Sequence, residues 1–216
     1  MKKALVILLL VISAAALSAQ NISLPAPATK SAVDLISAIA DRKVSKAFVK
    51  KNIPIADLST ILWSGLGMRG VDAISSATKA DRNISFSGDN AYINLYVLTE
   101  KGSWKYVADK NELKFISGND ARARISPAAI PAAAALILYT VDNALTPSFL
   151  KANPAIFLQM AHATAGFAAQ NIALTATTFK LASIVQYTLK AGDAIEALKL
   201  AKDEAPLFIQ QLGYTE

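Results

Sequence analysis

The sequence contains no cysteine and a single histidine among its 216 residues. Without cysteine the chain forms no disulfide, no thiolate metal site and no thiol nucleophile. One histidine, His162, also argues against a histidine metal site or a Ser-His-Asp triad. Its position in an apolar helical stretch favours a half-buried packing role. The aspartates are spread over expected helix caps and turns, where capping or solvated roles are the norm. No constellation for a hydrolase or a metalloenzyme is therefore recognised.

The charge balance is mildly basic, with a formal net charge of +6. Most lysines and arginines are scattered and do not form a basic stripe interleaved with aromatic residues, so we expect no nucleic-acid partner. One local concentration stands out, with five cations within residues 42–51.

The first residues have the three parts of a secretory signal peptide. Lys2 and Lys3 are followed by an apolar run over residues 4–11 and by small residues up to Ala19. The apolar run is shorter than the roughly 20 residues of a membrane-spanning helix. We expect a signal peptide over residues 1–19, one domain over residues 20–216 and a periplasmic or secreted protein without stable membrane association after cleavage. An uncleaved N-terminal anchor is the alternative, and the absence of cysteine excludes bacterial lipoprotein processing.

Apolar periodicity predicts helices and strands that alternate without strict βαβ repetition. Helices are predicted over residues 32–43, from residue 54 to the Gly65–Gly67 region, and over residues 120–129, 154–179 and 193–199. Strands are predicted over residues 91–98, 103–107, 112–116, 132–141, 181–187 and 206–214. The run 132–141 is apolar throughout and is expected to be central in the sheet. The fold class is therefore α+β in a single domain.

Five motifs occur in a recognisable order. Residues 22–27 are similar to I-x-L-P-x-P, residues 42–48 to R-R-S-x-R-x-F, and residues 58–69 to L-S-x-L-L-W-A-A-x-G-x-N-R with one residue fewer. Residues 165–174 are similar to A-G-x-x-A-Q-N-x-x-L, and residues 205–214 to a closing strand that ends in G-Y. Together they resemble the nitroreductase family of FMN-dependent oxidoreductases, in particular its short branch with thiazole-forming oxidases. The resemblance implies a central mixed or antiparallel sheet flanked by helices, and a homodimer with the flavin at the subunit interface.

The same resemblance supplies candidate cofactor-binding residues. Arg42, Lys43 and Lys46 match the family's basic positions and would hold the FMN phosphate, which requires cationic or N–H donors. Arg82 and Gly88 match the ends of the family's R-T-x-P-S-A-G segment and would border the flavin ring.

The sequence also departs from the family at three points. Val44 replaces a serine, Phe86 replaces the central serine of the ring segment and is expected to lie where the flavin edge would approach, and Lys180 replaces the first glycine of a G-L-G loop. A glycine there permits close approach or a positive φ, so Lys180 is expected to alter that path or to supply a new phosphate contact.

Two functions from different classes follow from these observations. The first is an exported FMN-dependent oxidoreductase acting on a small molecule. Because nicotinamide cofactors are scarce outside the cytoplasm, its electron donor is expected to be a different compound. The second is a non-catalytic binding or structural protein on the same scaffold that has lost FMN.

Overall fold

The computed structural model describes residues 20–68, 82–88 and 90–216. The expected signal peptide, residues 1–19, lies outside the described residues. The described chain forms a seven-stranded sheet in the order β1-β4-β3-β2-β5-β7-β6, in which every neighbouring pair is antiparallel. The predicted α+β class with a sheet flanked by helices is confirmed.

The strands are β1 (Ile22–Ser23), β2 (Ile93–Thr99), β3 (Gly102–Val107), β4 (Glu112–Ser117), β5 (Ala135–Asp142), β6 (Leu181–Gln186) and β7 (Glu204–Tyr214). The last six lie close to their predicted positions, whereas no strand was predicted at β1. The predicted central strand is β5, which pairs with β2 on one side and β7 on the other. All but the last of its residues are buried, because helices cover both faces of the sheet at this point.

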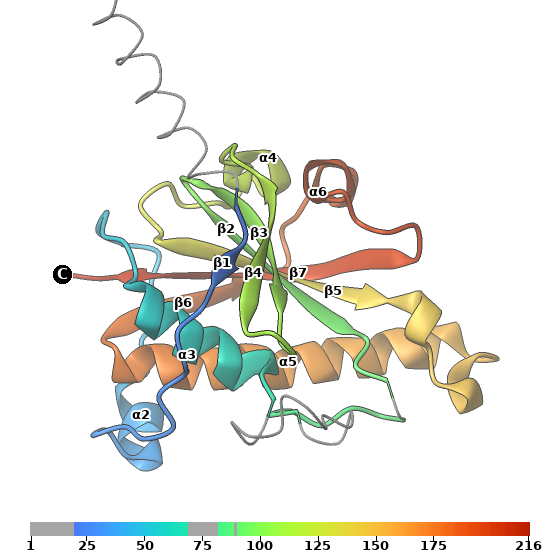
Figure 1. Ribbon diagram of the computed structural model, residues 1–216, viewed down its shortest axis with the longest axis horizontal. Helices are drawn as coiled ribbons and strands as arrows, with labels where there is room; N and C mark the ends of the chain where they lie inside the picture. The colour runs from blue at the N-terminus through green and yellow to red at the C-terminus, as the bar shows by residue number, and fades with distance from the viewer. Residues whose placement is uncertain (1–19, 69–81, 89) are drawn as a thin grey trace, which may run out of the picture.

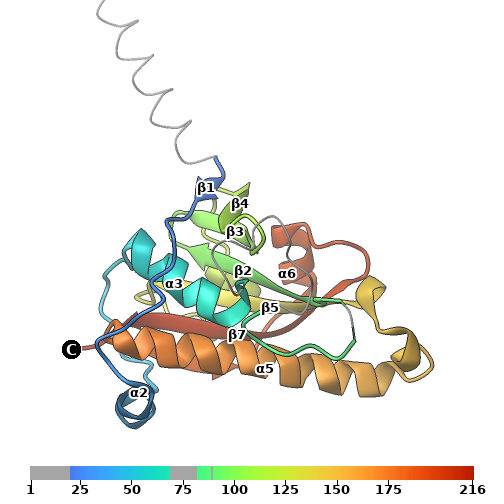
Figure 2. The same ribbon diagram turned by 60° about the horizontal axis from the view of Figure 1, so that its bottom comes forward.

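The helices divide between the two faces (Figure 1). One face is covered by α3 (Ile55–Leu66) and α5 (Pro154–Thr178), with α2 (Leu35–Asp41) packed against α5. The other face carries α4 (Arg122–Ile125) and α6 (Ala191–Leu198). Short 3-10 turns η3 (Asn143–Leu145) and η4 (Ser148–Leu150) lead from β5 into α5. Figure 2 shows α5 running beneath the sheet for most of its width.

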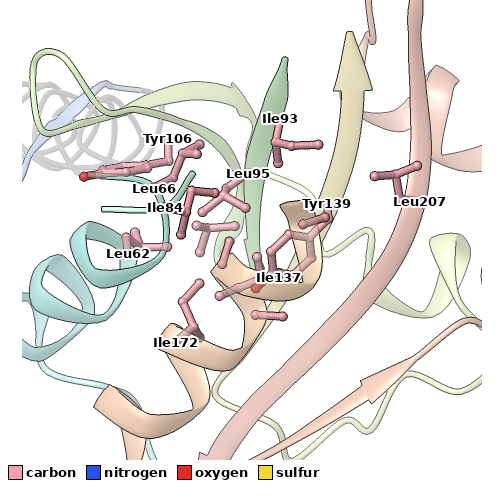
Figure 3. Close-up of a cluster of buried hydrophobic side chains, with 14 of the residues drawn as sticks. Leu62, Leu66, Ile84, Ile93, Leu95, Tyr106, Ile137, Tyr139, Ile172 and Leu207 are labelled. Atoms are coloured by element: carbon pink, nitrogen blue, oxygen red, sulfur yellow. The ribbon is translucent and has the colours of Figure 1, made fainter. Parts of the chain in front are cut away.

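The larger core lies between the sheet and the α3–α5 layer (Figure 3). Leu62 and Leu66 of α3 and Ile172 of α5 point toward Leu95 of β2 and Ile137 of β5. Alternate residues of β5 point the opposite way: Leu136 and Leu138 join the smaller core beneath α4 and α6. This alternation is the period-2 pattern of a strand buried on both sides.

Two helices differ from their predictions. α4 stops at Ile125, whereas the predicted helix ran to residue 129. Ser126 precedes Pro127 and takes the extended conformation (φ −137°, ψ 125°) that a following proline favours. α2 begins at Leu35, because Asp34 caps it by accepting a hydrogen bond from the Ser37 N–H at 2.9 Å. It ends at Asp41 and not at residue 43.

The last strand starts two residues before its predicted beginning at Pro206. β7 pairs Phe208 with Tyr139 and Pro206 with Thr140, so Leu207 is an extra residue opposite β5. Such a bulge interrupts the hydrogen-bond ladder and is one of the places where a strand tolerates proline. The strand therefore continues back through Pro206 to Glu204.

No helix in the described ranges is long and apolar enough to cross a lipid bilayer.

Candidate functional site

A groove runs between the outer flank of α5 and strand β6, with a volume of about 320 Å³. The segment after α2, helix α5 and the strands β6 and β7 all contribute to its wall. Its lining residues are Arg42, Val44, Gly166, Ala169, Gln170, Ala173, Ser183, Ile184, Val185, Tyr187 and Phe208. The α5 residues are small apart from Gln170, and this leaves room beside the helix.

The cationic segment 42–46 is held against β6 after leaving α2. Arg42 ends the helix with an extended ψ of 122°. The Ser183 N–H of β6 then donates a hydrogen bond to the Lys43 carbonyl at 3.1 Å. Arg42 and Lys43, which the sequence placed at the end of a helix, therefore lie in extended backbone along the edge of the sheet.

All three candidate phosphate ligands have side chains that are available to bind an anion. Arg42, Lys43 and Lys46 are exposed, and within the described part of the chain none of their side chains makes a hydrogen bond or an ion pair. The neighbouring cations differ. Lys50 pairs with Glu100 at 3.0 Å, and the Lys51 ammonium lies 4.1 Å from the centre of the Tyr214 ring.

Aromatic side chains form the other end of the groove. Phe208 is buried and stacks on Tyr139 with ring centroids 4.6 Å apart. The centroid of the Tyr187 ring lies 5.5 Å from that of Phe208 and 6.3 Å from that of His162. Tyr187 is 70% exposed. His162 is half-buried, in agreement with the packing role that its sequence context favours.

Arg82 is used by the fold itself. Its guanidinium donates to the Leu66 carbonyl at the end of α3 (3.1 Å) and to the Asp109 carboxylate (2.8 Å). Only 14% of its side chain is exposed, and its Nε is buried without a hydrogen-bond partner among the described residues. Its assignment to the border of a flavin ring stays a prediction, and in this structure the side chain joins α3 to the β3–β4 turn.

The ring segment near Gly88 lies at the N-terminal end of α5. Gly88 has φ +83°, and a Cβ there would be 3.0 Å from Pro147. The Phe86 ring packs edge-on against Tyr92 with centroids 5.1 Å apart. The ring is half-buried and packs against the core. Its expected place where the flavin edge would approach stays a prediction.

The five candidate residues therefore form two groups in one chain. Gly88 contacts residues that precede Pro154, whereas Arg42 lies beside Gly166 to Ala173. Arg82 is held at the end of α3, and Ser87 reaches Thr164 of α5 through the Tyr92 hydroxyl. In one chain, none of the described residues that line the groove beside Arg42 belongs to the ring segment 82–88.

Lys180 keeps the backbone conformation that favours glycine. Its φ is +62°, in the left-handed region, and its side chain is exposed. The expected effect of Lys180 on the path of this turn, or on phosphate binding, stays a prediction.

A model of the nitroreductase family matches residues 39–214, more than three quarters of the chain. The chain belongs to the nitroreductase family. The order of motifs had indicated this, and the assignment is confirmed. The sequence matches no curated protein at a significant level.

Solved structures of nitroreductases have the same fold. A protein from Ralstonia eutropha described as a nitroreductase is similar with a TM-score of 0.76 and 20% identity, over 92% of this chain and 91% of that one. A microcin synthetase complex from Escherichia coli (McbBCD) aligns with a TM-score of 0.63 and 16% identity over 89% and 77%. The NADPH:FMN oxidoreductase of Vibrio harveyi gives 0.56 and 17% over 84% and 69%.

Several groove residues of this nitroreductase-family chain were not predicted as site residues. Ser183, Tyr187 and Phe208 are brought together only by the pairing of β6 with β7 and by the packing of α5. Gln170 lies within the motif assigned to the long helix, so a signal for it was present. Tyr187 was visible only as the last residue of a predicted strand.

We expect Lys180→Gly to raise the free energy of unfolding by about 0.5–1 kcal/mol, because glycine adopts positive φ without a Cβ clash. The matched control is Lys151→Gly, because Lys151 is an exposed lysine with φ −57°. This variant should have a free energy of unfolding about 0.5–1 kcal/mol lower than the parent protein. Urea denaturation of the two variants measures the difference. Equal losses in both would mean that the left-handed backbone of Lys180 carries no strain.

We expect Arg82→Met to lower the free energy of unfolding by about 1–3 kcal/mol, because it removes a hydrogen bond from a charged donor to the end of α3. Asp109→Asn, at the exposed end of the pair, should cost less than about 1 kcal/mol. Thermal denaturation of both variants tests the structural role. An Arg82→Met protein as stable as the parent would contradict it.

Proposed function

We propose that the protein is an exported, homodimeric nitroreductase-family flavoprotein that binds FMN in the groove beside α5 and acts on a small molecule. The observation that carries the proposal is the cationic segment of Arg42, Lys43 and Lys46, of which Arg42 lines this groove. Among the described residues, none of the three side chains has a hydrogen-bond or ion-pair partner. Such cations next to a groove with an aromatic wall fit a ligand that has an anion at one end and a planar ring at the other.

The phosphate end of the ligand is the best supported. Arg42 lines the groove, and its planar guanidinium can contact two phosphate oxygens at once. Lys43 and Lys46 add point charges without that fork geometry. Ser183 and Gln170 add polar side chains to the same wall. Bound FMN would supply hydride transfer, and the protein's part is to bind and orient it.

The homodimer is supported by apolar side chains on the outer side of the molecule. Leu35 and Ile36 of α2 are 62% and 72% exposed, and Phe167 on the outer face of α5 is half exposed. In one chain, Ala38 is the buried residue of α2. Burial of this surface against a second copy would remove it from water.

A dimer would also resolve the separation of the two candidate groups. If α5 of one copy crosses α5 of another in an antiparallel sense, Gly88 of the first copy approaches Arg42 of the second. The site would then be completed only by two chains, as expected for a flavin at a subunit interface.

Export is supported by the sequence of residues 1–19 and implies a periplasmic or secreted location. Because nicotinamide cofactors are scarce outside the cytoplasm, the electron donor is proposed to be a different compound. The non-catalytic alternative is favoured by a specific observation: Arg82 and Phe86, both in the ring segment, are committed to contacts within the fold.

The visible absorbance of the purified protein, incubated with FMN and desalted, separates these functions. We expect a retained flavin band, and Arg42→Ala should weaken FMN binding about 10- to 100-fold, as expected for the loss of a charge-assisted hydrogen bond. Lys50→Ala is the matched control, because Lys50 is a nearby cation already paired with Glu100. A folded protein that retains no flavin would overturn the oxidoreductase proposal in favour of a binding protein.

We expect the parent protein to be a dimer, and Leu35→Asp combined with Ile36→Asp to give a monomer, because two buried carboxylates would be unpaired at the interface. Ile195→Asp is the control, since Ile195 is 44% exposed on α6 at the other face. Size-exclusion chromatography with light scattering gives the masses. A monomeric parent protein would contradict the dimer.

A further inference from the structure

We infer that Tyr187 is the wall on which the planar ring of the bound flavin stacks, so that β6 carries the phosphate contact near its start and the ring contact just beyond its end. This inference rests on the proposed FMN site and adds a ring-binding residue to it.

The spacing along β6 fits such a ligand. Ser183 holds the cationic segment through the Lys43 carbonyl, and Tyr187 follows four residues later. At a strand rise of about 3.3 Å per residue, the two positions are roughly 13 Å apart. A ribityl chain joins the phosphate and the ring of FMN, so one molecule lying along β6 would have its two ends at these positions.

The Tyr187 ring is supported on its inner side and open on its outer side. The centroid of the Phe208 ring, which is 2% exposed, lies 5.5 Å from that of Tyr187, with the ring planes tilted by 55°. The His162 and Tyr187 centroids are 6.3 Å apart, and the histidine ring is stacked over Phe208. Tyr187 therefore belongs to a packed aromatic cluster, yet it leaves most of its surface available for an incoming aromatic ring.

Within one chain no other aromatic residue of the candidate site is equally placed. The Phe86 ring packs against Tyr92, and Phe86 is not among the described residues that line the groove. Of the described groove residues, only Tyr187 and Phe208 are aromatic, and Phe208 is covered. None of the described residues lining the groove is acidic, so nothing there repels a phosphate.

The experiment is a titration of the full protein with FMN and with riboflavin, which has the ring but no phosphate, followed by flavin fluorescence. We expect the fluorescence of bound flavin to be quenched by the stacked phenol. Tyr187→Ala should restore fluorescence and weaken both ligands about 5- to 20-fold. Tyr187→Phe should keep most of the affinity. Ile195→Ala, which removes an exposed apolar side chain of α6 on the other face of the sheet, should behave like the parent protein.

The outcomes distinguish this inference from the proposed function. If the parent protein binds FMN, and Arg42→Ala lowers the affinity for FMN but not for riboflavin, the proposed FMN site is supported. If Tyr187→Ala then leaves both affinities and the quenching unchanged, the inference is overturned while the FMN site remains. If the parent protein binds neither ligand, the proposed function itself fails and the inference fails with it.

Discussion

The close approach of α5 to the sheet is the constraint on which the rest of the structure depends. The residues of this helix that face the strands are mostly alanines, among them Ala161, Ala165 and Ala168, all fully buried. Small side chains let the helix backbone lie near the strands. The larger Ile172 packs toward α3, where Gly65 makes room: a Cβ at Gly65 would lie 2.6 Å from the Ile172 Cδ1. With α5 fixed in this way, one flank holds α3 and the other leaves the groove along β6.

The parts of the fold that the sequence predicted well are those whose signal is local and long. The largely apolar run of β5 and the 25-residue helix α5 can each be predicted from their own residues alone. Errors occur where one neighbouring residue decides the outcome. The sequence alone extended α4 past Pro127, because apolar periodicity does not record the extended conformation that a proline favours in the residue before it. It started β7 at Pro206, because the bulge that lets the strand continue through this proline leaves no mark in the pattern.

The candidate site was predictable only in part, for a related reason. The cations at Arg42, Lys43 and Lys46 are visible as residue types at matching positions, and they have no ion-pair partner among the described residues. The partners of Arg82 and Phe86 are not visible in that way. Arg82 meets Asp109, 27 positions later in the chain, through the packing of α3 against a strand turn. The contact of Tyr187 with Phe208 likewise needs two strands to pair. Long-range contacts decide which charged and aromatic groups remain available, and motif matching does not encode them.

The place of β6 in the sheet gives the cationic segment a second consequence. β6 is the last strand of the sheet order, so one of its edges has no strand partner among the described residues. An open strand edge invites pairing with the same edge of another molecule, and positive side chains along it oppose such self-association. Residues 42–46 lie at this edge, held by the hydrogen bond between Ser183 and Lys43. The same cations would thus keep the protein from pairing with itself along β6 while they hold an anion on the other side of the segment.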